Sequence, residues 1–559
     1  MQKYFIGIDT GGTCTDAVLM ESATGKVVET AKEPTTHHRL SIGTANALKS
    51  LFTKADISPG QVRAVAVSST LATNSIVENK GARVALLVIG YVKHFRLPVK
   101  AVVFIKGGHT ITGKEEEPLD IEYLVDIVGG LRQEVDAYGV CSAMSIENPT
   151  HELVAEKAIS MIDPKPVFCS HRISQQAGMQ ERAATAGLHA KLMPLMQEYV
   201  TGVREAMTEQ RLDCPMVIVG GNGKIVSSTE AVQQAGVTVA SGPACTASFG
   251  AHQSGSDSLI IDIGGTTTDM AIIENGRPSL SPDGCTIGDW KTHVEAVDMH
   301  TGGIGGDSHV LIDEKGNMTI GPARVVPLAM STGFPDLSQW LGPSSASRCV
   351  RLVAVQRGEP KMAPILEALQ AHGPATPRRL RDATGLSGIP LDTQLEDLAR
   401  KQLIVETGFT PTDALHVLGR IDLGDRKASL AGATILGGLM GKGPEEFCTL
   451  VVAKTGEMIE NLIIEYIFTR TWGKTLTNFI STRRSHPILG VDFSLKIPLI
   501  GIGAAARFFL PGVAARLATT VSFPENYAVG NAIGAAMICR QELLPASQDK
   551  KNEDRDDEG

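Results

Sequence analysis

The sequence predicts an α/β fold built from two related halves. The first observation is a glycine- and threonine-rich stretch that occurs twice, at residues 8–17 and 261–270. The second is that apolar runs of strand length alternate with segments of helical spacing around these stretches. The third is the chain length of 559 residues, which is enough for two or more domains with sizeable cores.

Each repeated stretch is typical of a tight β-hairpin. One apolar run leads into it, another leaves it, and two glycines stand between them. Both copies keep an aspartate before the glycines and a second aspartate 7 residues later. A turn alone gives no reason to keep both carboxylates, so the repetition favours a binding function over a purely structural turn.

Phosphate binding is the chemistry that these residue types favour. Glycines let backbone N–H groups approach an anion, threonine hydroxyls add donors, and an aspartate at a strand end holds a hydrated Mg²⁺ or orients a water. We expect the phosphates to contact Gly11, Gly12, Thr13, Thr15, Gly264, Gly265, Thr266 and Thr267. We expect the four aspartates to be catalytic, with Asp9 and Asp262 holding Mg²⁺ through water and Asp16 and Asp269 as support or base.

The composition is that of a soluble globular protein, with 43% hydrophobic and 20% charged residues. No apolar run reaches the roughly 18 residues of a spanning helix, so we expect neither a signal peptide nor a membrane contact. The nine cysteines are scattered singly, which favours a reducing cytoplasm over a disulfide framework. The net charge of −9 gives no support to a general affinity for nucleic acid.

The duplicated hairpin resembles the phosphate-1 and phosphate-2 loops of the actin, sugar-kinase and Hsp70 ATPase superfamily. Its members clamp ATP between two related halves and close the site with a glycine-rich adenosine loop near the C-terminus. Residues 497–506 are similar to that loop, because an apolar run ends there in Gly-x-Gly and small residues. The resemblance implies duplicated ribonuclease-H-like domains, ATP and Mg²⁺ as cofactors, and adenosine contacts from Gly501, Gly503 and Ala504.

Helical and strand segments alternate after the first hairpin. Helical spacing occurs at residues 41–52 and 73–80, and apolar strands are expected at residues 62–67 and 83–89. This order is typical of an α/β domain.

Two short motifs in this region resemble the hydantoinase A and 5-oxoprolinase family. Residues 69–74 are similar to its Thr-Thr-x-Ala-Thr-Asn run, and residues 78–83 to its Lys-Gly-Ala-Arg turn. The family begins the first run with His-Gly, where this chain has Val67-Ser68. The resemblance implies substrate contacts for two residues of the run, Thr73 and Asn74. A helix cap is the alternative role of these two residues.

Further motifs of the same family follow in order. Residues 181–185 are similar to its Glu-x-x-Arg-x-x-Thr segment at the head of a long helix. Residues 220–223 and 240–244 match the positions of its Ser-Asn-Gly-Gly and Ser-Gly-Pro-Ala turns. The resemblance implies that Arg182 reaches a substrate carboxylate, and a surface helix with a capping threonine is the alternative.

The stretch 293–309 is rich in glycine and histidine. It resembles the family's Asp-x-His-Thr-Ile-Gly-Ala-Gly-Gly-Gly run, from which Asp307 departs. We expect this loop to line the nucleotide or substrate cleft. The expected contacts are Gly302 and Gly303 with the nucleotide, and Asp298 and His300 with the substrate. Its histidines and aspartates also allow a metal site, although their spacing fits no standard template.

Residues 355–410 interrupt the expected pattern. Their outline consists of three helices, at 362–371, 374–384 and 390–402, and a strand at 403–408. This outline is winged-helix-like and introduces nucleic-acid binding as a rival function. The third helix would enter the groove, but it carries three acidic residues against Arg400 and Lys401. A recognition helix should be basic, so nucleic acid is an unfavoured partner and a structural or partner-docking insert is expected.

The last part of the chain completes the second half. A family motif resumes at residues 410–420, and a long helix is expected at 445–469. We therefore expect an N-terminal hydantoinase/oxoprolinase-type domain at 1–250, a second ATPase-like domain at 251–354 and 411–546, the insert at 355–410, and a disordered acidic tail at 547–559.

The resemblance implies ATP-dependent activation of a cyclic amide, such as a hydantoin, 5-oxoproline or a related lactam. The carbonyl oxygen attacks the γ-phosphoryl group, and the phosphorylated intermediate is open to hydrolysis or carboxylation. The family assigns the second step to a B-type subunit, so we expect such a partner, and a homo-oligomer is also allowed. The alternatives are a small-molecule kinase and a regulatory or activator ATPase with a nucleic-acid-binding insert.

Overall fold

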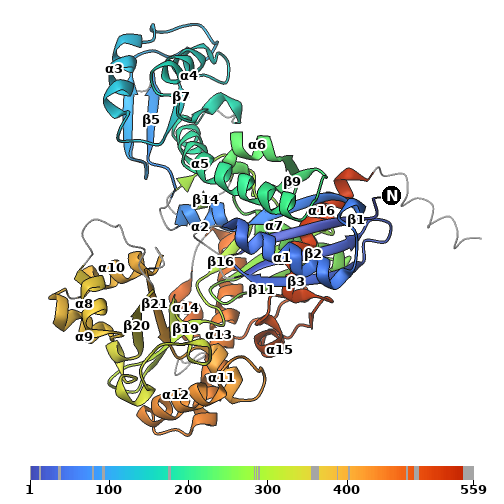
Figure 1. Ribbon diagram of the computed structural model, residues 1–559, viewed down its shortest axis with the longest axis vertical. Helices are drawn as coiled ribbons and strands as arrows, with labels where there is room; N and C mark the ends of the chain where they lie inside the picture. The colour runs from blue at the N-terminus through green and yellow to red at the C-terminus, as the bar shows by residue number, and fades with distance from the viewer. Residues whose placement is uncertain are drawn as a thin grey trace, which may run out of the picture. The chain divides into compact units, whose positions relative to one another are not determined.

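The computed structural model describes residues 2–11, 14–35, 40–77, 81–90, 95–173, 178–281, 284, 286–287, 290–353, 364–386, 388–400, 403–473, 476–483 and 490–544. Gly12, Thr13 and the predicted tail at 547–559 lie outside these residues. The chain divides into two compact units (Figure 1). The first contains residues 1–257, 271–299 and 529–559, and the second contains residues 258–270 and 300–528.

The first hairpin belongs to a six-stranded sheet in the first unit. The strand order is β10-β9-β4-β1-β2-β3. β1 pairs antiparallel with β2 and parallel with β4, and β4 pairs parallel with β9. The strands are β1 (Tyr4–Thr10), β2 (Cys14–Glu21), β3 (Val27–Pro34), β4 (Val62–Ser69), β9 (Met216–Val219) and β10 (Ile225–Ser227).

The second hairpin lies in a sheet that repeats this arrangement. Its strand order is β13-β12-β11-β22-β23, with β16 also paired to β12. β11 pairs parallel with β22, and β22 pairs parallel with β23. The strands are β11 (Ser258–Ile263), β12 (Thr268–Glu274), β13 (Arg277–Pro278), β16 (Met299–Gly302), β22 (Leu499–Ile502) and β23 (Val521–Ser522). The repeated order confirms the prediction of duplicated ribonuclease-H-like sheets.

Helices cover both faces of the first sheet. One apolar core joins the sheet to α1 (Leu40–Ala55) and α5 (Met179–Glu209). On the other side a smaller core joins β1 and β4 to α7 (Ser241–Ser254) and α16 (Gly530–Leu543). The predicted boundaries assign α16 to the second domain, whereas the structure groups it with the first unit because it packs directly on β1.

Gly7 of β1 allows this close contact. A Cβ atom at Gly7 would lie 1.9 Å from the carbonyl oxygen of Ala532 in α16. Gly7→Ala is therefore expected to destabilise the protein by about 3 kcal/mol or more, because backbone must move to admit the methyl group. Gly129→Ala is the control: Gly129 lies in a helix with no heavy atom within 4 Å of an added Cβ. Urea unfolding midpoints measure both, and an unchanged midpoint for Gly7→Ala would contradict the packing.

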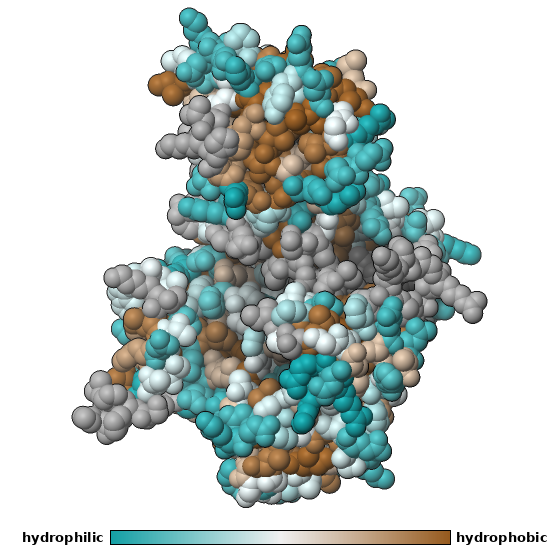
Figure 2. All heavy atoms as spheres, turned by 90° about the vertical axis from the view of Figure 1, so that its left-hand side faces the viewer, coloured by the Kyte–Doolittle hydropathy of each residue, from teal (hydrophilic) through white to brown (hydrophobic). Residues whose placement is uncertain are grey.

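A separate four-stranded parallel sheet is inserted between β4 and β9, after α2 (Leu71–Val77). Its order is β6-β5-β7-β8. The elements are β5 (Val84–Ile89), β6 (Ala101–Ile105), α3 (Ile121–Leu131), β7 (Ala137–Ser142), α4 (Thr150–Ile162) and β8 (Val167–Cys169). We call this part the inserted subdomain; it forms the upper part of Figure 1. Figure 2 shows hydrophobic residues gathered on its surface among hydrophilic ones.

The predicted insert in the second half forms three helices as expected. They are α8 (Pro364–His372), α9 (Pro377–Thr384) and α10 (Ile389–Arg400), and they share an apolar core with the flanking strands. The strand after them, β21 (Ile404–Gly408), pairs antiparallel with β20 (Arg348–Leu352), which precedes them. β21 therefore completes the sheet of this module. It does not form one strand of a hairpin wing.

The remaining elements connect these parts. They are α6 (Ser228–Gln233), β14 (Thr286–Ile287), β15 (Trp290–Lys291), β17 (Ser308–Ile312), β18 (Met318–Arg324), β19 (Val326–Pro327), α11 (Pro411–Val417), α12 (Arg426–Leu439), α13 (Pro444–Trp472), α14 (Thr477–Thr482) and α15 (Ala506–Arg516). Among the helices that the structure describes, none combines the length and apolarity needed to cross a bilayer.

Candidate phosphate-binding site

The two hairpins turn in the same way. In the first, Asp9 lies opposite Asp16 in the strand register, and the Gly11 N–H donates to the carbonyl oxygen of Cys14 over 3.0 Å. In the second, the Gly264 N–H donates to the carbonyl oxygen of Thr267, also over 3.0 Å. These are equivalent positions, so the repeat in the sequence is also a repeat in backbone geometry.

Asp9 is buried and held by side chains from distant parts of the chain. Its Oδ1 accepts a hydrogen bond from Ser68 Oγ at 2.7 Å, and its Oδ2 accepts one from Asn531 Nδ2 at 3.2 Å. Asn531 Oδ1 in turn accepts from Thr246 Oγ1. Burial raises the pKa of Asp9, and the bonds from Ser68 and Asn531 partly offset this rise. The result is a carboxylate with fixed orientation at the end of β1.

Asp16 has a different partner. Lys32 Nζ of β3 lies 2.6 Å from Asp16 Oδ1, and the Asp16 side chain is 12% exposed. Burial raises the pKa of Asp16 to about 6, although the charge of Lys32 opposes the rise. Desolvation therefore outweighs the ion pair at this position.

This pKa predicts a pH dependence of stability. The folded state binds the Asp16 proton more tightly than the unfolded chain, whose aspartates titrate near pH ~4. Stability is therefore lost as pH rises from about 4 to about 6. Relative to Asp16→Asn, the wild type should lose up to roughly 3 kcal/mol of unfolding free energy over that window. Urea titrations at several pH values measure it, and a constant difference between the two proteins would contradict the burial effect.

The aspartates of the second hairpin also lie at a tight turn. Asp269 Oδ1 accepts from Thr301 Oγ1 at 2.6 Å, and its Oδ2 accepts from Thr267 Oγ1 at 3.3 Å. Burial raises the pKa of Asp269, and these two bonds lower it in part. Asp262 lies against Gly503, where an added Cβ would come within 2.3 Å of Asp262 Oδ1.

The glycine loop after the second hairpin packs directly on its turn. The Gly306 N–H donates to the Gly264 carbonyl oxygen at 3.0 Å, and the Asp307 N–H donates to that of Gly265 at 2.7 Å. A Cβ at Gly305 would lie 2.5 Å from the Gly265 oxygen. The role of this loop at the nucleotide stays a prediction, and its close packing on the hairpin requires the glycine at Gly305.

Asp307, the departure from the family pattern, also belongs to this turn. Its Oδ1 accepts from Thr412 Oγ1 at 3.3 Å, and its Oδ2 pairs with Arg324 at 3.4 Å. Burial raises the pKa of Asp307. Thr412 belongs to the family motif at residues 410–420, which follows the insert. This motif therefore contacts the glycine loop that packs on the second hairpin.

The predicted adenosine loop follows β22, which pairs with β11. Gly503 has a φ of +83° and its N–H donates to the Tyr527 carbonyl oxygen at 3.0 Å. Ala504 is exposed. Gly501 is buried, and an added Cβ there would lie 2.4 Å from the Phe523 ring, so packing explains this glycine. Gly302 is likewise buried, and an added Cβ there would lie 2.3 Å from the Leu462 side chain, whereas Gly303 is exposed.

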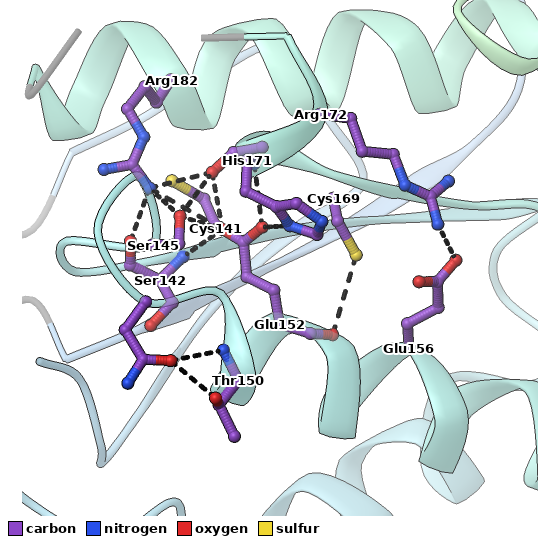
Figure 3. Close-up of polar contacts among 12 residues, drawn as sticks. Cys141, Ser142, Ser145, Thr150, Glu152, Glu156, Cys169, His171, Arg172 and Arg182 are labelled. Carbon is purple, nitrogen blue, oxygen red and sulfur yellow. Dashed lines mark hydrogen bonds and ion pairs between the residues drawn. The ribbon is translucent and has the colours of Figure 1, made fainter. Parts of the chain in front are cut away.

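The five predicted substrate residues are not brought together as one group. Thr73 Oγ1 accepts from the Ala240 N–H at 3.0 Å and so joins α2 to the turn before α7. Arg182 is 0% exposed and its Nη2 donates to Ser145, to Ser170 and to the Ser142 carbonyl oxygen (Figure 3). His300 stacks on Tyr466 with ring centroids 5.6 Å apart. Asp298 is partly exposed, and Asn74 lies in α2.

The stretch 293–309, whose histidines and aspartates allowed a metal site, contributes to no group of three close potential ligands among the described residues. Among the described residues, one group of three potential ligands lies close enough for a metal, and it consists of Glu152, Cys169 and His171. That group belongs to the inserted subdomain.

Sequence reasoning missed the residues that hold the aspartates. Asp9 binds Ser68, which is 59 residues away, and Asn531, which is 522 residues away. Asp16 binds Lys32, which is 16 residues away. Ser68 stands where the family has the glycine of its His-Gly pair, and this difference was a usable signal. Asn531 lies in a run of small residues that suggests only close helix packing.

Comparisons with known proteins identify the family. The family model for the hydantoinase/oxoprolinase N-terminal region matches residues 5–162, and the hydantoinase/oxoprolinase model matches residues 182–429. The alpha subunit of caprolactamase from Pseudomonas jessenii is 26% identical over 361 residues, covering 57% of this chain and 50% of that protein. The gamma subunit of acetophenone carboxylase from Aromatoleum aromaticum is 25% identical over 363 residues, covering 57% and 49%.

Two solved structures share the fold over nearly the whole chain. Nucleotide-free acetone carboxylase has a TM-score of 0.67 at 17% identity, covering 96% of this chain and 70% of that chain. The ATP-dependent caprolactamase from Pseudomonas jessenii has a TM-score of 0.64 at 20% identity, covering 95% and 70%. The chain spans about half the length of the curated relatives it matches. With both family models matched in order along it, the chain belongs to the hydantoinase/oxoprolinase family.

Proposed function

We propose that this chain is the ATP-using subunit of an enzyme that activates the carbonyl group of a lactam or related compound. The observation that supports this proposal most directly is the pair of equivalent hairpin turns, each with an aspartate at the end of its first strand. Both hairpins bind phosphate groups of ATP in this proposal, and backbone N–H groups and threonine hydroxyls are the donors. The relatives that are named an ATP-dependent caprolactamase and a carboxylase support the substrate class.

Asp9 and Asp262 are the residues that would hold Mg²⁺ through water. Carboxylate oxygens are the hard donors that this ion prefers. Asp9 suits the role because Ser68 and Asn531 fix its orientation while each oxygen keeps a further lone pair. When bound, Mg²⁺ neutralises charge on the phosphates. Asp16 and Asp269 support the two turns or act as a base.

The reaction we propose is phosphoryl transfer to the carbonyl oxygen of the substrate. A bond forms between that oxygen and the γ-phosphorus, the bond to the β-phosphate oxygen breaks, and ADP leaves. The protein supplies position and charge neutralisation in such a step. In a second step, which we assign to a B-type partner subunit, water attacks the activated carbonyl carbon and inorganic phosphate leaves. The subunit names of the relatives support a partner.

The experiment is a survey of phosphate release with a panel of hydantoins and lactams, each paired with its ring-opened form as control. We expect one cyclic compound to raise the rate while its ring-opened form does not, and mass spectrometry to show ring opening once the partner subunit is added. A stable phosphorylated product would instead identify a small-molecule kinase. If no carbonyl compound raises the rate of phosphate release, either with or without the partner subunit, the proposal is contradicted.

A further inference from the structure

A compact group of potential metal ligands lies in the inserted subdomain, outside both hairpins. Glu152 comes from α4, Cys169 ends β8, and His171 lies in the 3₁₀ turn Ser170–Arg172 that follows (Figure 3). One carboxylate oxygen, the thiol sulfur and a ring nitrogen all lie within 4.8 Å of one another. None of the three has a part in the proposed phosphoryl transfer.

Glu152 is held as an anion by an unusually complete set of donors. Its Oε1 accepts from the Ser142 N–H, Ser145 Oγ and Ser170 Oγ at 2.8, 2.7 and 2.6 Å. Its Oε2 accepts from the His171 N–H at 3.0 Å and lies 2.6 Å from His171 Nδ1. Burial acts to raise the pKa of Glu152, but these bonds outweigh it and the pKa is lowered.

The two carboxylate oxygens have separate surroundings. Arg182 Nη2 lies 3.7 Å from Oε1, and the serines bind the same oxygen. Oε2 faces His171, and Cys169 Sγ lies 3.7 Å from the main-chain oxygen of Glu152. Oε1 therefore binds the serine network and Oε2 faces the imidazole, and the Cys169 thiol completes a group whose ligand atoms lie within 4.8 Å of one another.

We propose that Glu152 Oε2, His171 Nδ1 and Cys169 Sγ form a binding site for a divalent transition metal of the Zn²⁺ class. This mixed set of oxygen, nitrogen and sulfur donors matches the ligands of Zn²⁺. Bond lengths of about 2.0–2.3 Å require ligand atoms roughly 3–4 Å apart, so the three atoms need only small shifts. The serines and backbone N–H groups that orient Glu152 are the outer partners that metal ligands normally have.

Three protein ligands leave a fourth position for water or another small ligand. The His171 side chain is 18% exposed, whereas Glu152 and Cys169 are buried. Metal binding converts the thiol to a metal-bound thiolate with release of one proton, and the neutral imidazole keeps its proton on Nε2. Because binding releases this proton, the affinity should increase with pH.

The test is a titration of chelator-treated full-length protein with Co²⁺, followed by its absorption spectrum. We expect one Co²⁺ per chain with a thiolate-to-cobalt charge-transfer band, and displacement of that band by Zn²⁺. Cys169→Ser should lose the band, and His171→Asn, which can still donate to Glu152, should weaken binding by roughly tenfold or more. Cys214→Ser is the matched control, because Cys214 is a partly buried thiol outside the group.

Each outcome decides the proposal. A wild-type protein that gives no thiolate band overturns it, as does a Cys169→Ser protein that retains the band. If Cys169→Ser fails to fold by circular dichroism, the His171→Asn titration decides. The readout is metal binding, so it is independent of ATP turnover and of the proposed function.

Discussion

Replacing Asp262 or Asp9 with asparagine is expected to lower ATP turnover by roughly 10²-fold or more, with the fold retained. The amide has the shape of the carboxylate but carries no charge to hold a hydrated cation. Asp262 lies beside Gly503, and Asp9 is oriented by Ser68 and Asn531. Phosphate release under saturating ATP measures the effect, and circular dichroism reports the fold.

The matched control is Asp313→Asn. Asp313 is a partly exposed aspartate at the turn between β17 and β18, where it accepts hydrogen bonds from Asn317 and Lys315. Its replacement should leave turnover unchanged within about twofold, because a surface substitution has little effect elsewhere. If both hairpin variants retain wild-type turnover, the aspartates do not act on the nucleotide.

Gly305→Ala is expected to have the second large effect, a loss of nucleotide binding of roughly tenfold or more. The added Cβ would lie 2.5 Å from the Gly265 oxygen and 2.7 Å from the Gly264 oxygen. Neither atom is a flexible side-chain end, so the turn of the second hairpin must move. Overpacking of this kind also costs about 1–3 kcal/mol of stability.

A control substitution at a second glycine of the same unit separates the loss of nucleotide binding from the loss of stability. Gly438→Ala, in α12, adds a Cβ with no heavy atom within 4 Å, and it should bind nucleotide as the wild type does. Binding by Gly305→Ala is best measured at a temperature where thermal unfolding shows that both variants are folded. Wild-type affinity in folded Gly305→Ala would show that the glycine loop does not support the phosphate-binding turn.

The fold could be predicted because its signals are local. Two hairpins with the same aspartate spacing imply the same strand–turn–strand unit, and the register that pairs Asp9 with Asp16 follows from that spacing. Helical periodicity also located the helices of the insert to within a few residues. The pairing of β21 with β20 was missed, because it joins strands on either side of the three helices.

The surroundings of the site residues could not be predicted, because they depend on contacts between distant segments. The sequence suggested that Arg182 faces a substrate, but the fold buries it beside Glu152, which lies 30 residues earlier on another helix. A substrate role for Arg182 therefore stays a prediction. In the sequence, Asp307 was visible only as a departure from the family's glycine pattern. Its contact with the second hairpin depends on the path of the whole glycine loop, which the sequence does not give.

The raised pKa values of the site acids show why burial has to be known. Asp16 has a lysine partner in the adjacent strand, and the pairing alone would lower its pKa. Desolvation reverses the direction and raises the pKa to about 6. Sequence reasoning can identify an ion pair across neighbouring strands. It does not give the exposed fraction of the side chain, which decides whether the pKa rises or falls.

The most direct test of the central claim is isothermal titration calorimetry of the purified chain with ATP and Mg²⁺. The account predicts one ATP bound per chain, weakened by chelation of the metal and by Asp262→Asn, and retained in Asp313→Asn. Absence of ATP binding to the folded wild-type protein would contradict the claim that the hairpins bind phosphate.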